Sequence, residues 1–165
     1  MLVAMLSMMV ITQMPNGERF GIGLDMSLGG AVYKRPDVSP QRFDLGVRAH
    51  FEGRVGKVLL GGFAQLAATV GEDLRLGVGP VLRVELPRDF ALLVSPGFYG
   101  RNTTSWEPGV NASVVAFWYS LIGLGVETRF GLGPTHERAI VASAQLNVVS
   151  IPTLLFALAW GKGPT

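Results

Sequence analysis

The stretch RFDLGVRAHFEG, residues 42–53, decides the fold because apolar and polar residues alternate along it without a break. One parity is apolar and consists of Phe43, Leu45, Val47, Ala49 and Phe51. The other is small or polar and consists of Asp44, Gly46, Arg48, His50 and Glu52. Side chains of a β-strand point to opposite faces with a period of two, so the stretch predicts a strand with one apolar and one charged face. Either the apolar face is the core of a water-soluble sheet, or it meets lipid and the charged face lines a barrel.

The same period of two recurs along almost the whole chain after Gly17. It predicts about eight strands, at 19–33, 42–53, 57–70, 74–86, 90–101, 110–130, 140–150 and 153–160. The segments between them carry turn residues, at 34–41, 53–56, 71–73, 87–89, 101–109 and 131–138. Sequential strands with short connections favour one all-β domain, an antiparallel up-and-down barrel over 18–161. Residues 1–17 are apolar without preceding basic residues, and are expected to be a signal remnant or an N-terminal extension.

The composition excludes several function classes. Only 16% of the 165 residues are charged, against about 25% in typical soluble domains. The net charge of +2, without a basic cluster, argues against nucleic-acid binding. The absence of cysteine excludes disulfides and thiolate chemistry. Two histidines without a carboxylate at ligand spacing predict no metal site, and no cofactor is expected.

The polar face predicts a barrel lumen filled by side chains. It alternates Gly, Ala and Ser with isolated long polar residues, whereas water-facing sheets carry dense Lys, Thr and Glu. Small residues with a few long ones would fill the narrow interior of an eight-stranded barrel, which argues against a wide diffusion pore. Buried charge is tolerated only when it is paired, and the charges of this face nearly balance. The expected lumen network consists of Arg48, Glu52, Arg75, Arg83, Glu85, Glu127 and Arg129.

The spacing of aromatic residues on the apolar face fits a bilayer. Phe43 and Phe51 are eight residues apart on one face, and so are Phe90 and Phe98. Eight residues of a tilted strand span about 20 Å along the membrane normal, close to the height of the apolar band between aromatic girdles. The expected membrane-interface aromatics are Phe43, Phe51, Phe90, Phe98, Trp118 and Trp160.

The pattern over 18–160 resembles that of small bacterial outer-membrane barrels of the OmpA transmembrane-domain and OmpX type. The resemblance is one of patterning, without a residue-level signature. It implies an integral outer-membrane protein that contacts the lipid bilayer and has a structural or surface-interaction role. With both termini periplasmic, 34–41 and 101–109 would be external loops for a surface ligand or an envelope protein. In the loop 101–109, Trp106 is either a contact residue for a partner or, as the simpler interpretation, an anchor at the membrane interface. The segment 131–138 would be a long periplasmic turn.

Two prolines raise an alternative. If 87–89 is the centre of a hairpin, Pro80 and Pro96 lie opposite each other on adjacent strands, where proline cannot donate a ladder hydrogen bond. The pair predicts either a bulge or non-bonded position, or a weak seam open to lipid. Outer-membrane palmitoyltransferase barrels are similar in using proline-marked gaps to admit an acyl chain.

Three function classes therefore stay open. The sequence favours a membrane barrel with a structural or interaction role. A lipid-modifying enzyme would need a Ser–His–acid site, for which the candidates are Ser95, His50 and Glu52. A packed luminal histidine is the simpler interpretation of His50, and His136 is expected to be a solvated turn residue. The third class is a soluble β-barrel that binds a hydrophobic ligand.

Overall fold

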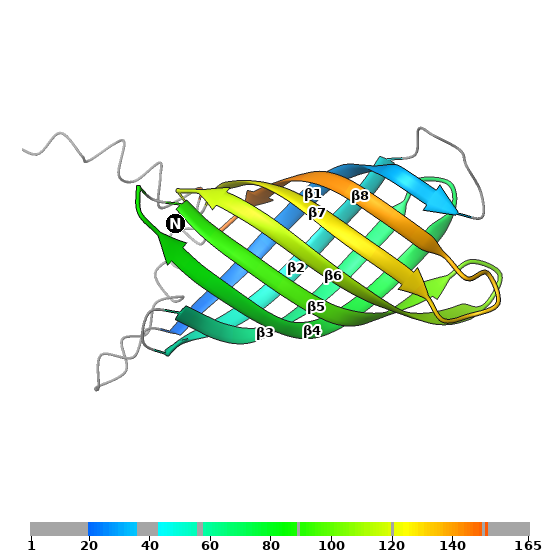
Figure 1. Ribbon diagram of the computed structural model, residues 1–165, viewed down its shortest axis with the longest axis horizontal. Helices are drawn as coiled ribbons and strands as arrows, with labels where there is room; N and C mark the ends of the chain where they lie inside the picture. The colour runs from blue at the N-terminus through cyan, green and yellow to red at the C-terminus, as the bar shows by residue number, and fades with distance from the viewer. Residues whose placement is uncertain are drawn as a thin grey trace, which may run out of the picture.

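The computed structural model describes residues 20–35, 43–55, 58–88, 90–119, 121–149 and 151. These residues form one closed barrel of eight antiparallel strands, in which each strand pairs with the next and β8 pairs with β1 (Figure 1). The strands are β1 (Phe20–Arg35), β2 (Phe43–Val55), β3 (Val58–Thr69), β4 (Asp73–Leu86), β5 (Phe90–Asn102), β6 (Trp106–Trp118), β7 (Ile122–Gly131) and β8 (Arg138–Asn147). The prediction of a single all-β up-and-down barrel with eight strands is confirmed.

The prediction of one long strand at 110–130 is wrong, because the structure divides this segment into β6 and β7. The two strands meet at a tight turn, in which the Leu121 amide donates to the Trp118 carbonyl at 3.0 Å. Tyr119 has a φ of 52° in this turn. Trp118 and Ile122 pair across it on the same outward parity, so the alternation continues through the turn and hides it. The predicted strand at 153–160 lies outside the described residues.

The extra turn changes which end of the barrel each connection occupies. The β7–β8 connection lies at the same end as those after β1, β3 and β5, which we call the loop end. The connections after β2, β4 and β6 lie at the opposite end, the turn end, together with Phe20 and Asn147. The placement of 131–138 as a turn on the side of the termini is therefore wrong. The predicted loop 101–109 is also too long, since β5 and β6 leave only 103–105 between them.

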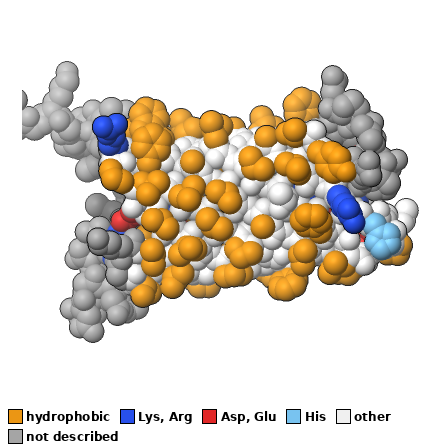
Figure 2. Space-filling view, viewed as in Figure 1, with side chains coloured by type: hydrophobic (Ala, Val, Ile, Leu, Met, Phe, Trp, Pro, Cys, Tyr) orange, Lys and Arg blue, Asp and Glu red, His pale blue; other side chains and the backbone are white. Residues whose placement is uncertain are grey.

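The distribution of side chains is the reverse of that in a water-soluble protein. Outward positions of the strands carry large apolar residues, with Leu124 71% and Phe98 69% exposed. Inward positions carry charged residues that are buried, with Asp25 1% and Arg129 3% exposed. In Figure 2, hydrophobic side chains cover the side of the barrel, and the charged side chains visible in this view lie near its two ends. Among the described residues, no helix is long and apolar enough to cross a bilayer.

Candidate functional site

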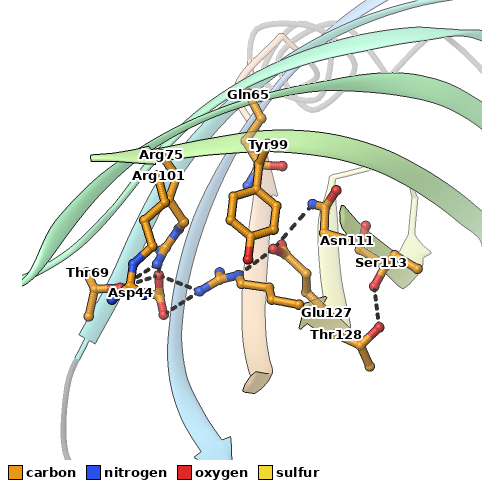
Figure 3. Close-up of polar contacts among 12 residues, drawn as sticks. Asp44, Gln65, Thr69, Arg75, Tyr99, Arg101, Asn111, Ser113, Glu127 and Thr128 are labelled. Carbon is orange, nitrogen blue, oxygen red and sulfur yellow. Dashed lines mark hydrogen bonds and ion pairs between the residues drawn. The ribbon is translucent and has the colours of Figure 1, made fainter. Parts of the chain in front are cut away.

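The lumen near the loop end contains a charge cluster that joins four strands (Figure 3). Arg75 of β4 donates to Asp44 of β2 and, at 2.9 Å, to Asp73. Arg101 of β5 donates to the other oxygen of Asp73 at 2.5 Å. Arg129 of β7 reaches across the lumen to Asp44 at 3.2 Å. Buried charges are stable only when they are paired and hydrogen-bonded, and here each arginine has at least one carboxylate partner.

Glu127 extends this cluster along β7. Its carboxylate accepts a hydrogen bond from Arg129 Nε at 2.6 Å and another from the Asn111 side chain of β6 at 3.4 Å. Arg129 therefore lies between Glu127 and Asp44 and links β7 to β2 through the interior. This pairing joins two strands that are not neighbours in the sheet, because β8 and β1 lie between them.

The connection between β7 and β8 folds back onto the barrel mouth. Glu137, only 1% exposed, accepts a hydrogen bond from the Tyr99 hydroxyl at 3.0 Å and lies 3.5 Å from Arg101. Thr135 donates to Glu107, a buried residue of β6. These contacts attach the segment 132–137 to β5 and β6, so that it forms a fixed part of the loop end.

The middle of the lumen is filled by Arg48 and its partners. The Arg48 guanidinium donates to Ser95 at 2.8 Å, to Ser113 at 3.1 Å and to Gln65 at 2.7 Å. It also lies 4.7 Å from the centre of the Phe63 ring, a cation–π distance. Ser95 and Ser113 are hydrogen-bonded to each other at 2.7 Å. These residues come from β2, β3, β5 and β6.

A second charged group lies around His50, closer to the turn end. One ring nitrogen is 2.8 Å from Glu52 and the other is 3.3 Å from Asp25 of β1. Arg83 of β4 approaches Glu52 at 3.8 Å. The imidazole ring lies against Gly23, where a side chain would overlap it. Nδ1 is hydrogen-bonded to Glu52, whereas Nε2 lies at ion-pair distance from Asp25 and neither of these two groups makes a hydrogen bond.

The turn end of the lumen holds an apolar cluster that the sequence analysis did not predict. Its members are Val81, Ala91, Leu93, Val115 and Phe117. They occupy inward positions of β4, β5 and β6, where a lumen of small and polar residues was expected. Elsewhere a polar cavity of about 20 Å³, bordered by Asp25, Asp44 and Arg48, has room for about one water molecule.

The structure places the residues of the expected lumen network as follows. Arg48, Glu52, Arg75, Glu127 and Arg129 are buried inside the barrel, and the Arg83 side chain is 14% exposed. Glu85 departs from the expectation, because its side chain is 49% exposed at the turn-end rim. It pairs there with Arg54 at 2.5 Å. The strand parity is inward, but the position lies beyond the packed interior.

Among the described residues, six buried Asp, Glu or Arg residues of the lumen were missing from the expected network: Asp25, Asp44, Asp73, Arg101, Glu107 and Glu137. Asp73 and Glu107 lay in predicted turn segments into which the strands continue, whereas Glu137 lies in the β7–β8 connection. The parity was a usable signal for Arg101, because it continues the inward register of Tyr99.

The aromatic residues of the outer face gather at two levels. At the loop end these are Tyr33, Phe43, Phe98, Trp106 and Phe130, and at the turn end Phe51, Phe90, Trp118 and Tyr119, all exposed. Phe90 pairs directly with Trp118. Trp106 is the first residue of β6 and projects outward over Gly100, which corrects its placement in an external loop. Trp160 lies outside the described residues.

The proline pair interrupts the β4–β5 ladder. Pairing stops at Val78 with Phe98 and resumes at Leu82 with Val94, and the register places Pro80 opposite Pro96. Both prolines are exposed on the outer face. Neither has an amide hydrogen to donate across the seam. The strands stay close there, since a side chain at Gly79 would overlap the Pro96 carbonyl and lie 2.8 Å from the Phe63 ring.

Of the three candidate catalytic residues, only two contact each other. His50 contacts Glu52, and its second nitrogen faces Asp25. Ser95 is bonded to Arg48 and Ser113. The contacts of the described residues therefore join His50 to Glu52 but do not bring Ser95 to the imidazole.

Comparison with known proteins supplies no family. No protein-family model matches the chain, and no curated protein matches it. Solved structures that it is similar to include a de novo designed transmembrane β-barrel, at 14% identity and a TM-score of 0.47, over 76% of this chain and 95% of that one. The designed barrel TMB2.3 has 13% identity and a TM-score of 0.47, over 82% and 98%.

A third solved structure is a loop-deletion mutant of OmpT, an outer membrane protein of Vibrio cholerae. It has 11% identity and a TM-score of 0.36, and the match covers 82% of this chain and 56% of that one.

Proposed function

We propose that this protein is an integral barrel of the bacterial outer membrane with a structural or surface-interaction role and a non-conducting lumen. The observation that carries the proposal is the reversed distribution of side chains around the closed barrel. Leu124 and Phe98 are more than two-thirds exposed, while Asp25 and Arg129 are buried. A water-soluble barrel with this surface would expose a continuous apolar band to solvent, at a large cost in hydration free energy.

The aromatic residues support the same orientation. Phe43, Phe98 and Trp106 belong to the loop-end level, and Phe51 and Trp118 belong to the turn-end level. Aromatic rings concentrate at the two interfaces of a bilayer, because one part of the ring is apolar and its edge tolerates headgroups and water. The apolar band between the two levels then meets the hydrocarbon core.

The side chains that fill the lumen support a role that does not depend on diffusion of solutes through the barrel. Charge pairs occupy the loop end, Arg48 and Phe63 occupy the middle, and Leu93 and Phe117 belong to the apolar cluster at the turn end. An eight-stranded barrel has an interior only wide enough for its own side chains. The surface available to a ligand or an envelope protein is then the loop end, where 132–137 is held in place.

The other function classes have weaker support in the structure. A soluble barrel for a hydrophobic ligand would have an apolar interior, whereas here apolar side chains dominate the outside. A lipid-modifying enzyme would need Ser95 within reach of His50, and their contacts are with other residues. The proline seam does not change this, because the Phe63 ring packs behind Gly79 and Gly97.

The test is fractionation of bacteria that express the chain behind an intact secretion signal. We expect the protein in the outer-membrane pellet after an alkaline wash, with a heat-dependent shift in gel mobility that reports a folded barrel. A soluble periplasmic protein expressed in the same cells serves as the control for the wash. Recovery of folded, monodisperse protein without detergent would refute the membrane assignment.

A further inference from the structure

The imidazole of His50 is buried between two carboxylates that come from different strands. Its Nδ1 is 2.8 Å from Glu52 on the same strand, β2, and its Nε2 is 3.3 Å from Asp25 of β1. All three residues are less than one-tenth exposed. The ring also packs against Gly23 of β1, its partner in the register, so closely that a Cβ there would overlap it. The group is therefore enclosed inside the lumen.

The counter-charge of Asp25 depends on His50. Neither carboxylate oxygen of Asp25 accepts a hydrogen bond, and among the described residues His50 is the one basic side chain within ion-pair distance of it. Arg48 borders the same small cavity, but its guanidinium donates to side chains of β3, β5 and β6. The other charged residues of this cavity pair with one another, namely Asp44, Glu127 and Arg129. A buried carboxylate without a counter-charge is strongly destabilising.

Glu52 differs from Asp25, because it has a second cation nearby. Arg83 of β4 lies 3.8 Å from Glu52. The neighbours in the register on the other two strands are not titratable, since Phe63 of β3 pairs with the histidine and Asn147 of β8 pairs with Asp25. Loss of the imidazolium charge would therefore leave Glu52 beside an arginine and would remove the ion pair of Asp25.

We propose that His50 is a pH-sensitive switch for the stability of the barrel. A protonated imidazole has two N–H groups and a positive charge, so it pairs with both carboxylates at once. A neutral imidazole has one donor and one acceptor, so a lone pair faces one of the two acids. The stabilisation is present while the ring holds its proton, and it is lost as the pH rises through the point at which the folded protein releases that proton. This inference goes beyond the proposed function, because it concerns the interior of the barrel and not the surroundings of its outer face.

The experiment measures the rate at which the full chain unfolds in guanidinium, in detergent micelles, between about pH 6 and about pH 10. We expect the wild-type barrel to unfold about tenfold faster at the upper end of this range than at the lower end. His50→Gln should unfold fast at every pH and lose the acceleration, because it leaves Asp25 without its cation throughout. A wild-type rate that does not change with pH would overturn the proposal.

His136→Gln is the matched control, since His136 is the other histidine of the chain and is exposed in the β7–β8 connection. This variant should keep the acceleration of the wild type. Asp25→Asn removes the carboxylate that loses its partner, and a neutral ring can still donate to Glu52. Its unfolding rate should therefore be nearly independent of pH. The proposal is overturned if Asp25→Asn keeps the full response, or if His136→Gln loses it.

A measurement on the wild-type protein makes the test independent of whether His50→Gln folds. The NMR signals of the imidazole carbons report the protonation of each ring, and His136→Gln assigns those of His50. We expect the unfolding rate to rise over the same pH interval in which the His50 signals change. A rise in rate while the His50 signals stay constant would overturn the assignment of the switch to this ring.

Discussion

At the scale of single residues, the burial of a charged side chain decides how much its ion-pair partner contributes to the stability of the barrel. Arg129 has a side chain 4% exposed and contacts two carboxylates, Glu127 and Asp44. Arg54 has one partner, Glu85, and their side chains are 27% and 49% exposed. The buried group has lost its hydration and depends on its partners, whereas water screens the pair at the rim.

We therefore expect Arg129→Gln to lower the free energy of unfolding by about 3–5 kcal/mol, because it removes the ion-pair partner of the buried Glu127 and one of the two arginines that contact the buried Asp44. Arg54→Gln makes the same chemical change at the turn-end rim and should cost about 1 kcal/mol or less. Reversible unfolding in detergent micelles or vesicles measures both. Equal losses in the two variants would show that the interior pairing is not what stabilises the barrel.

The alternation in the sequence predicted the inward direction of residues such as Arg48 and Arg129, because parity is a local property of a strand. It did not predict which carboxylate each arginine meets. Arg129 reaches Asp44, 85 positions away in the chain, and this partnership depends on closure of the barrel and on its register. For Glu85 the parity itself was misleading. The residue has inward parity, but its position along the barrel axis places its side chain at the exposed rim.

At the scale of the strand, the β4–β5 seam is the place where the ladder is interrupted. The sequence analysis placed Pro80 opposite Pro96, and the register agrees with that placement. It did not anticipate the role of the flanking glycines. Gly79 and Gly97 allow the two backbones and the Phe63 ring to meet, so the missing amide hydrogens are accompanied by close packing.

Substitution of a glycine in β4 tests this packing. A Cβ at Gly79 would lie 2.7 Å from the Gly97 Cα and would overlap the Pro96 carbonyl, so Gly79→Ala should destabilise the barrel by about 1–3 kcal/mol. Gly77 is the matched control, two residues away on the same inward face. A Cβ there would make ordinary contacts, the nearest at 3.5 Å from the Phe98 carbonyl.

Gly77→Ala should therefore be neutral or stabilising by up to about 1 kcal/mol, because alanine restricts the unfolded chain. Unfolding midpoints of the two variants in the same micelles provide the comparison. If both substitutions were equally tolerated, the close approach at Gly79 would not be a constraint on the seam.

The division of 110–130 into β6 and β7 is the strand-scale error of the sequence analysis. Trp118 and Ile122 have the same outward parity, and the turn between them contains neither glycine nor proline. The turn requires a positive φ at Tyr119, and tyrosine is not a residue type that predicts a turn. The sequence did contain one sign of this error. Treating 110–130 as a single strand placed the long connection 131–138 at the end of the barrel where short turns are expected.

At the scale of the whole molecule, the closed barrel turns an alternating sequence into an apolar exterior and a packed interior. From the loop end to the turn end, the lumen contains the Asp44–Arg129 cluster, the Arg48–Phe63 contact, and the apolar cluster with Leu93 and Phe117. The sequence analysis did not predict the apolar cluster, although strand parity places Leu93 and Phe117 on the inward face. Three layers of different chemistry close the same lumen.

This layering predicts that the barrel does not conduct ions. Wild-type protein reconstituted in a planar bilayer should show no steady current steps, because Arg48 and Phe63 lie in the middle of the lumen and the polar cavity beside Arg48 measures only about 20 Å³. The variant Arg48→Ala/Phe63→Ala removes the middle layer and should produce brief openings. Leu124→Ala, a side-chain truncation on the outer face, should produce no current steps. Steady conductance by the wild-type protein, at the level of an open pore, would contradict the filled lumen and with it a role confined to structure and surface interaction.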